Sequence, residues 1–372
     1  MANTLRRITK VFIASSNIVV AIVFLIACFV PYLNPTKWWF LSHLSLGFPF
    51  LLLAVAGFFI FWILVKPKWA LVSLISLIIG WKSISVFLGF NLSHRFNEEK
   101  KQHTLRVASW NVARFVELKK NNNKGSQVRL RMMDLLKAQN ADILCLQEFH
   151  TSVKPGYYDN IKYIRKELNY PYFYFSYDED GDGLYYSSII FSKLPIINTG
   201  KLTYPKPTLP EVLLHVDIKL GIDTIRVFTT HLQSVQFRKS DYIRIEKIKN
   251  QDDGLIGNSR TIFSKIKRGF GYRGIQADIV KARIDKSPYP FLLCGDFNDV
   301  PNSYTYFTIK KGLKDAFLEK GLGIGRTYAS LSPTLRIDYL LADPQFSVVQ
   351  YKRVVNDYSD HYLQVADFRL NK

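Results

Sequence analysis

The stretch 291–298 combines an apolar run with two polar residues whose spacing suits catalysis. The run that ends at Cys294 predicts a buried strand, and Gly295 allows a sharp turn before Asp296 and Asn298. If the backbone stays extended, Asp296 and Asn298 lie on one face. A carboxylate and an amide placed in this way can orient a water molecule beside a metal-bound phosphate. The alternative interpretation is an ordinary strand followed by an Asx-type turn.

Similar polar groups follow other predicted strands. They are oxygen or imidazole donors, namely Asn111, Glu148, His231, Asp338, Asp360 and His361. Two carboxylates and an amide around a cation suit Mg²⁺ or Mn²⁺, which prefer oxygen ligands. Asp338 is the candidate partner that would fix the tautomer of His361. The chain has three cysteines and no Cys-x-x-Cys pair, which speaks against a thiolate zinc site and against a disulfide framework.

The elements that must position these residues begin near residue 104. Apolar or alternating runs predict strands at 105–110, 141–146, 185–191, 212–218, 225–229, 291–294 and 336–341, and a last strand follows His361. Helical spacing occurs over 128–139, and residues 234–287 form a mostly helical connection rich in Lys and Arg. That connection fits a polyanion, an acidic membrane surface or simply a solvated helical face. The mixture of strands and helices indicates an α/β domain.

Residues 1–90 differ from the rest of the chain in their composition, which is mostly apolar. Apolar stretches at 11–33, 39–65 and 69–90 predict a membrane module of about three helices, although Lys82 interrupts the third. A cleaved signal peptide competes with the first stretch, but the second apolar stretch argues against it. Residues 91–103 are polar and predict a linker to a catalytic domain at 104–372.

Basic residues predict the orientation of this module. Arg6, Arg7 and Lys10 precede the first stretch, and Lys66 and Lys68 separate the second from the third. The positive-inside rule places these residues in the cytoplasm. Three crossings would put the catalytic domain outside the cytoplasm, whereas a third stretch that does not span would leave it inside.

The net charge of the chain is strongly positive. Lys and Arg number 50 against 30 Asp and Glu, which gives a formal charge of +20. Such a surplus favours anionic partners: nucleic acid, phospholipid headgroups or phosphorylated small molecules. Nothing in the sequence predicts a protein partner.

Six short motifs occur in an order that resembles one superfamily. They are Trp110-Asn111, Gln147-Glu148, Thr230-His231-Leu232, Gly295-Asp296-Phe297-Asn298, Arg336-Ile337-Asp338-Tyr339 and Ser359-Asp360-His361. Together they resemble the endonuclease/exonuclease/phosphatase superfamily over roughly residues 104–370. The resemblance implies a four-layer α/β sandwich, in which two mixed sheets lie face to face between helices. It also implies Mg²⁺-dependent cleavage of phosphoester bonds.

The resemblance implies a metal centre and a water-activating residue. Glu148 resembles the principal metal ligand, and Asn111 and Asp360 lie close to the metal or its waters in such a site. Asp296 resembles the residue that activates or orients the attacking water. Asn298 resembles its neighbour that holds the phosphate or that water.

Two histidines complete the implied site. His361, paired with Asp338, resembles the histidine at the scissile phosphate, and His231 resembles the one that contacts a phosphate oxygen or assists the leaving group. Relatives often carry Gly-Asn where Ser187-Ser188 stands here, which leaves the substrate class open. The expectation is therefore a membrane-anchored, Mg²⁺-dependent phosphoester hydrolase, with a nuclease as the first expectation. A phospholipid or sphingolipid phosphodiesterase, or a non-catalytic binding protein on the same fold, remain the alternatives.

Overall fold

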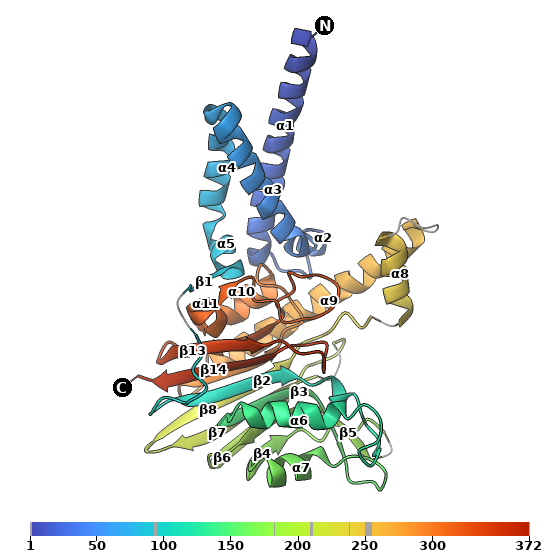
Figure 1. Ribbon diagram of the computed structural model, residues 1–372, viewed down its shortest axis with the longest axis vertical. Helices are drawn as coiled ribbons and strands as arrows, with labels where there is room; N and C mark the ends of the chain where they lie inside the picture. Colours follow the sequence, from blue (N-terminus) through green and yellow to red (C-terminus); the bar gives the residue numbers. More distant parts are fainter. Residues whose placement is uncertain are drawn as a thin grey trace. The chain divides into compact units, whose positions relative to one another are not determined.

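The computed structural model describes residues 2–92, 95–181, 183–208, 211–237, 239–249 and 255–371 (Figure 1). The chain forms two compact units. The first comprises residues 1–88, 235–275 and 300–308, and the second comprises residues 89–234, 276–299 and 309–372.

The second unit contains two six-stranded mixed sheets. The first has the order β13-β14-β2-β3-β5-β4, and the second has the order β10-β12-β9-β8-β7-β6. The strands of the first sheet are β2 (Leu105–Asn111), β3 (Ile143–Ser152), β4 (Tyr172–Phe175), β5 (Leu184–Ser192), β13 (Phe346–Val354) and β14 (Leu363–Leu370). Those of the second are β6 (Ile196–Thr203), β7 (Val212–Leu220), β8 (Asp223–His231), β9 (Phe291–Asp296), β10 (Lys314–Asp315) and β12 (Asp338–Ala342). A two-stranded ribbon pairs β1 (Gly89–Phe90) with β11 (Leu322–Gly323).

Each sheet is mixed because one pair of its strands is parallel. The parallel pairs are β2 with β3 and β8 with β9, and the remaining neighbours in both sheets are antiparallel. A parallel pair requires a crossover connection. The helix α6 (Val128–Ala138) lies in the crossover from β2 to β3, and α8 (Lys239–Lys249) and α9 (Leu255–Ile284) lie in the crossover from β8 to β9.

The two sheets pack face to face through one apolar core. Val107 and Cys145 of the first sheet share this core with Leu214, Val227 and Cys294 of the second. Period-two alternation turns the intervening residues outward, where helices cover them.

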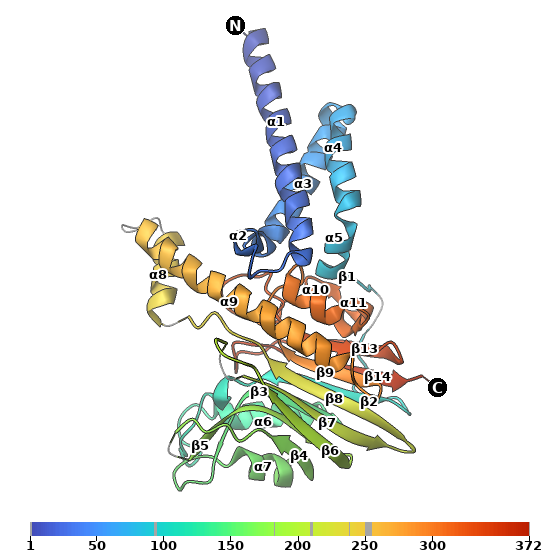
Figure 2. The same ribbon diagram turned by 180° about the vertical axis from the view of Figure 1, so that it is seen from behind.

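Helices supply the outer layers of the sandwich. Trp110 of β2 packs with Met133 of α6 and with Ile164 of α7 (Asn160–Glu167) on the outer face of the first sheet. On the other side, the last turns of α9 lie over β8 and β9 (Figure 2). The fold is therefore the expected four-layer α/β sandwich. Its remaining short helices are η2 (Ala113–Phe115) and α11 (Ala316–Lys320).

The first unit contains the apolar N-terminal helices. They are α1 (Ala2–Phe29), η1 (Val30–Tyr32), α2 (Trp39–Ser42), α3 (Leu44–Val65), α4 (Pro67–Ile79) and α5 (Trp81–Phe87), joined by α8, the first part of α9 and α10 (Tyr304–Lys310). In the described part of the chain, two helices are long and apolar enough to cross a membrane, at Arg6–Tyr32 and Leu44–Val65. The pair α4–α5 bends by 65° and makes a third span only if it is counted as one.

The bend between α4 and α5 falls at Gly80, and the surroundings of this residue explain why it is a glycine. A β-carbon at position 80 would lie 2.7 Å from the ring of Phe24 and 3.0 Å from the sulfur of Cys28, both on α1. The close approach of α1 to this bend therefore requires a residue without a side chain.

The first part of α9 packs on the connection between α1 and α3. Phe263 stacks on the ring of His43 at 3.9 Å, and the ammonium of Lys267 lies 4.0 Å from the ring of Trp39. Phe270 and Gly274 continue the same helix face toward His43 and Pro35. The spacing of these four α9 residues is that of one helical stripe. The basic connection is thus part of the unit that holds the apolar helices.

The predicted linker makes specific contacts with the sandwich. The backbone N–H of Asn97 donates to Gln350 on β13 at 3.0 Å, and the carboxylate of Glu98 lies 2.7 Å from the ammonium of Lys352. Residues 93 and 94 of this segment lie outside the described residues. The domain boundaries predicted from the sequence stay a prediction.

Candidate active site

Strand pairing brings four of the predicted site residues to one edge of the sandwich. Asn111 ends β2 and lies opposite Gln147, next to Glu148 in the parallel strand β3. His231 ends β8 and lies opposite Asp296, the last residue of β9. Since the two sheets face each other, the ends of these parallel pairs meet and place a carboxylate, an amide and an imidazole together.

One carboxylate oxygen of Asp296 forms the centre of the cluster. Its Oδ2 accepts a hydrogen bond from the side-chain amide of Asn111 at 3.1 Å. The same oxygen lies 3.7 Å from Nε2 of His231 and 3.6 Å from Nε2 of His361. The carboxyl is buried, and this burial together with the nearby carboxylate of Asp338 raises its pKa. Two imidazoles thus converge on a single buried carboxylate.

His361 is held by a second carboxylate. Its Nδ1 lies 2.9 Å and 3.1 Å from the two oxygens of Asp338, which leaves Nε2 directed at Asp296. Asp338 is positioned by β12, where it lies opposite Asp296 in the antiparallel register. Burial disfavours the charged ring, but Asp338 and Asp296 outweigh this effect and raise the pKa of His361 to about 10. The imidazole is therefore protonated at neutral pH.

His231 has a partner that the sequence did not reveal. Its Nδ1 lies 3.5 Å from Oε2 of Glu211, just before β7, and its buried Nε2 has no hydrogen-bond partner among the described residues. Burial again opposes the charge, but Glu211, Asp296 and Glu148 raise the pKa of His231 to about 10. The register of the β7–β8 hairpin pairs Leu213 with Thr230, so it brings the residues just before Leu213 near His231. A correct prediction of this hairpin register would therefore have identified Glu211 as the partner of His231.

Asn298 does not extend the strand as the first expectation required. Its backbone N–H donates to Oδ1 of Asp296 at 2.7 Å, and its φ is 52°, so the alternative, an Asx-type turn, is what forms. Its side-chain amide donates to the backbone oxygen of Leu232 at 2.9 Å. The expectation that Asp296 and Asn298 share one face of an extended strand was wrong, because the Asp296 carboxylate accepts a hydrogen bond from the backbone N–H of Asn298 and turns the chain there. Asn298 instead ties the end of β9 to the residue after His231.

Two further carboxylates, Glu148 and Asp360, lie in the outer part of the site. Glu148 adopts a positive φ of 50° within an irregularity of the β3–β5 pairing, and its side chain is 29% exposed. Asp360 precedes His361 and is exposed. Its pKa is raised because desolvation and the carboxylates of Glu148 and Asp296 disfavour its charge, an effect that solvent screens at this exposed position. These two groups offer accessible oxygens at the mouth of the cluster.

The donor set fits a hard divalent cation. Mg²⁺ is commonly bound through one or two carboxylates and several waters, and Glu148 and Asp360 supply such carboxylates. The side-chain oxygen of Asn111 accepts from the backbone N–H of Ala113 at 3.1 Å and its amide nitrogen lies 3.3 Å from Glu148, so the role of Asn111 as a ligand stays a prediction. Asp296, Asp338 and His361 also each have one potential ligand atom within 4.8 Å of the other two. However, the carboxylate of Asp338 is already hydrogen-bonded to Nδ1 of His361.

A further cationic side chain, that of Arg114, lies beside the site, and none of the six sequence motifs contains it. The guanidinium of Arg114 lies 4.0 Å from the ring of Tyr186 and 2.9 Å from a carboxylate oxygen of Asp180. The pKa of the half-buried Tyr186 is raised mainly by desolvation and next by the negative charge of Glu148. Arg114 follows the strand that ends at Asn111, and its charge is paired with the carboxylate of Asp180.

Comparisons with known proteins were made for the whole chain. Residues 108–361 match the model of the Endonuclease/Exonuclease/phosphatase family, and residues 9–87 match a domain of unknown function, DUF8431. No curated protein matches the chain in sequence. Among solved structures, an endonuclease/exonuclease/phosphatase from Beutenbergia cavernae DSM 12333 is similar with a TM-score of 0.51 and 20% identity, over 73% of this chain and 72% of that chain. The human Nocturnin catalytic domain with bound sulfate anion has a TM-score of 0.50 and 17% identity, over 73% of this chain and 97% of that chain.

At these identities the solved structures show the fold alone. The family model, however, covers more than half of the chain and runs from β2 to His361, over every residue of the cluster. The sandwich fold and the position of the cluster at the strand ends are consistent with this match. The chain belongs to the endonuclease/exonuclease/phosphatase family.

Proposed function

We propose that this chain is a membrane-anchored, divalent-metal-dependent phosphodiesterase, with nucleic acid as its substrate class. Membership of the family supports hydrolysis of phosphoester bonds. The observation that carries the proposal is the approach of two imidazoles, each backed by a carboxylate, to one buried oxygen of Asp296. A site of this kind combines a group that can orient water with two cations that can stabilise charge on a phosphoryl group.

Each residue has a defined task in this proposal. Asp296 orients the attacking water and accepts its proton, while His231 and His361 donate hydrogen bonds to the phosphoryl oxygens. Glu211 and Asp338 keep the two rings protonated and oriented. Glu148 and Asp360 would hold Mg²⁺, with Mn²⁺ as a substitute, and this ion supplies Lewis-acid stabilisation of the phosphoryl group when bound. Asn111 keeps the carboxylates of Glu148 and Asp296 in place.

The proposed side of the membrane follows from contacts within the first unit. If α1 and α3 both cross, their connection lies on the side opposite the N-terminus. The first part of α9 packs on this connection through Phe263 and Lys267, so it lies on that side too. The sandwich is continuous with α9 and therefore shares that side. Together with the basic residues before α1, these contacts support our proposal that the catalytic domain lies outside the cytoplasm.

The test uses the full chain in lipid nanodiscs. Plasmid DNA, RNA, sphingomyelin and the small diester bis(4-nitrophenyl) phosphate are offered with Mg²⁺ or with EDTA. We expect Mg²⁺-dependent cleavage of nucleic acid and of the small diester. His361→Ala should lower both rates by about 10²- to 10⁴-fold, whereas His103→Ala, at an exposed position in the same unit, should leave them unchanged. Equal rates for the His361 variant and the wild type would overturn the proposed role of the cluster.

A lipid phosphodiesterase is the second candidate. The observation that favours it is the membership of α8 and the first part of α9 in the unit of apolar helices, since such an enzyme meets its substrate at the bilayer. Cleavage of sphingomyelin without cleavage of DNA or RNA would establish this candidate in place of the nuclease. Intact metal-free and Mg²⁺-loaded protein that cleaves none of the four substrates would favour the non-catalytic alternative.

A further inference from the structure

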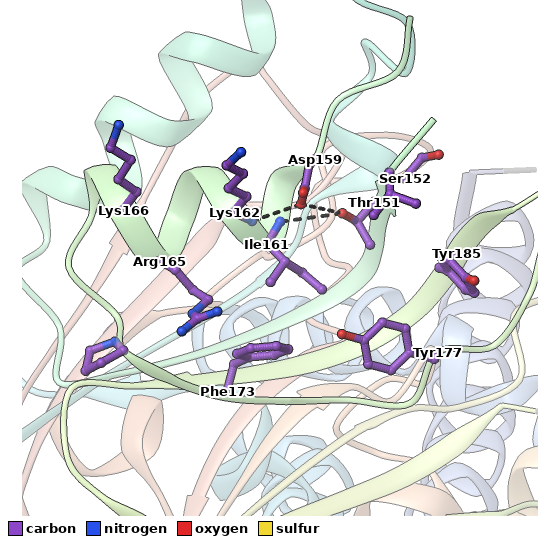
Figure 3. Close-up of a pocket in the computed structure, with 12 residues that line it drawn as sticks. Thr151, Ser152, Asp159, Ile161, Lys162, Arg165, Lys166, Phe173, Tyr177 and Tyr185 are labelled. Carbon is purple, nitrogen blue, oxygen red and sulfur yellow. Dashed lines mark hydrogen bonds between the residues drawn. The ribbon is translucent and has the colours of Figure 1, made fainter. Parts of the chain in front are cut away.

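A pocket of about 700 Å³ lies beyond the catalytic cluster along strand β3 (Figure 3). Its lining includes Thr151 and Ser152, the last two residues of β3. Glu148 lies three residues before Thr151 on the same strand, which corresponds to roughly 10 Å at the rise of a β-strand. A substrate that extends roughly 10 Å beyond the bond cleaved at the cluster would therefore reach the pocket.

One wall of the pocket is aromatic. Phe173 and Tyr177 belong to β4 and the segment after it, and Tyr185 belongs to the neighbouring strand β5. The ring centroids of Tyr177 and Tyr185 are 5.5 Å apart with the rings nearly perpendicular. Tyr177 is 52% exposed, which is unusual for a large ring packed against others. An exposed, immobilised ring of this kind offers a flat face on which a base can stack.

The opposite wall is cationic. Three exposed basic residues, Lys162, Arg165 and Lys166, project from the short helix α7. In Figure 3, Arg165 extends toward Phe173, and its guanidinium lies 5.4 Å from that ring, while Lys162 and Lys166 extend away from the aromatic wall. The carboxylate of Asp159 caps α7 by accepting the backbone N–H of Lys162 at 2.9 Å. The lining of this pocket thus contains three basic side chains and one carboxylate, that of Asp159, so its net charge is positive.

The cationic wall continues into a second pocket of about 770 Å³. Lys162 and Lys166 line both pockets, and Lys120 and Lys154 add charge to the second, which also contains Glu167. A row of cations beside flat aromatic faces matches a ligand that alternates phosphates with planar bases. A bilayer surface would instead call for an apolar rim, and all of these residues belong to the unit that lacks the apolar helices.

We propose that this pocket binds single-stranded nucleic acid that extends from the catalytic cluster. One base stacks on the exposed ring of Tyr177. Arg165, which covers the ring of Phe173, pairs with the phosphate beside that base, and Lys162 and Lys166 pair with neighbouring phosphates. This inference rests on the proposed nuclease function and narrows its substrate to single strands, because a base inside a duplex is not free to enter the pocket.

The test measures binding of a fluorescein-labelled 15-nucleotide oligothymidine to the full chain in nanodiscs, with EDTA present so that no cleavage occurs. Tyr177→Leu should weaken binding by about 5- to 100-fold without changing its salt dependence. The double variant Lys162→Gln/Lys166→Gln should weaken binding and reduce the slope of log Kd against log salt by about 1.4, as expected for two lost phosphate contacts on a single strand. The matched control Arg131→Gln/Lys137→Gln removes two exposed cations of α6 outside both pockets and should bind as the wild type.

Hydrolysis of bis(4-nitrophenyl) phosphate separates this inference from the proposed function. The small diester does not reach the pocket, so all pocket variants should hydrolyse it at the wild-type rate. Wild-type affinity of the pocket variants for the oligonucleotide would overturn the inference even if the small diester is cleaved. Loss of affinity for inositol hexakisphosphate with unchanged oligonucleotide binding would also overturn it, because the pocket would then take a phosphorylated small molecule.

Discussion

At the scale of single residues, the site is two carboxylate–imidazole pairs that share one acceptor. In the proposed mechanism Asp338 contacts His361 and not the substrate, so we expect it to act as a positioning residue. We expect Asp338→Asn to lower kcat by about 10- to 100-fold. In a double-mutant cycle on DNA cleavage, Asp338→Asn should add almost nothing to His361→Ala, because the pair acts as one group. Fully additive effects would show that Asp338 serves a separate purpose.

Glu211 should act on His231 in the same way. Glu211→Gln removes the charge that lies 3.5 Å from Nδ1, and we expect a loss of about 10- to 100-fold in kcat with little change in KM. Glu319→Gln, which removes an exposed carboxylate from α11, is the control and should leave both constants unchanged. A rise in KM alone would mean that Glu211 contributes to substrate binding rather than to the orientation of His231.

At the scale of elements, a buried ion pair joins β2 to β14. Arg106 and Asp367 lie opposite each other in the register, with Nε 2.7 Å from Oδ1, and both side chains are buried. Asp367→Ala would leave the guanidinium without its carboxylate and should destabilise the second unit by about 3–5 kcal/mol. The double variant Arg106→Met/Asp367→Leu should recover most of this loss. Thermal unfolding of the full chain, followed by tryptophan fluorescence, checks both expectations, and a double variant as unstable as Asp367→Ala would contradict them.

Central strands could be predicted from the sequence, whereas edge strands could not. Apolar or alternating runs identified β2, β3, β8 and β9, because central strands place many apolar residues in the core. The strands β4, β6 and β13 lie at the edges of the two sheets, and β6 alternates between exposed and half-buried residues. The apolar signal of β6 is weak for that reason, whereas β4 is aromatic throughout but only four residues long.

The same contrast holds within the site. Strand ends identified Asp296 and His231, since a polar residue after an apolar run is visible in the sequence, whereas His361 precedes β14 and was identified through the motif Ser359-Asp360-His361. The partner of His231 is Glu211, which depends on the register of the β7–β8 hairpin and precedes no motif. The turn at Asn298 depends on a single side chain-to-backbone hydrogen bond, for which the sequence permits two outcomes.

At the scale of the whole molecule, the number of membrane crossings decides where the chemistry occurs. The native cysteines Cys28, Cys145 and Cys294 are all buried, so introduced cysteines can be labelled selectively. With three crossings, an impermeant maleimide added to intact cells or right-side-out vesicles should label Thr36→Cys and Lys137→Cys but spare Lys66→Cys. These three positions are exposed in the structure. Labelling of position 36 with positions 66 and 137 both spared would show that α4 and α5 do not make a third crossing.

The crossover from β8 to β9 carries a consequence for how such a protein can change over generations. His231 ends the strand before this crossover and Asp296 ends the strand after it, and six paired residues fix the two strands in register. The intervening helices can therefore lengthen, shorten or acquire new surfaces while the two reactive groups remain opposite each other. In this chain, α8 and the first part of α9 belong to the unit that contains the apolar helices. Descendants could be redirected to other surfaces by exchange of this one segment, without renewed selection on the catalytic cluster.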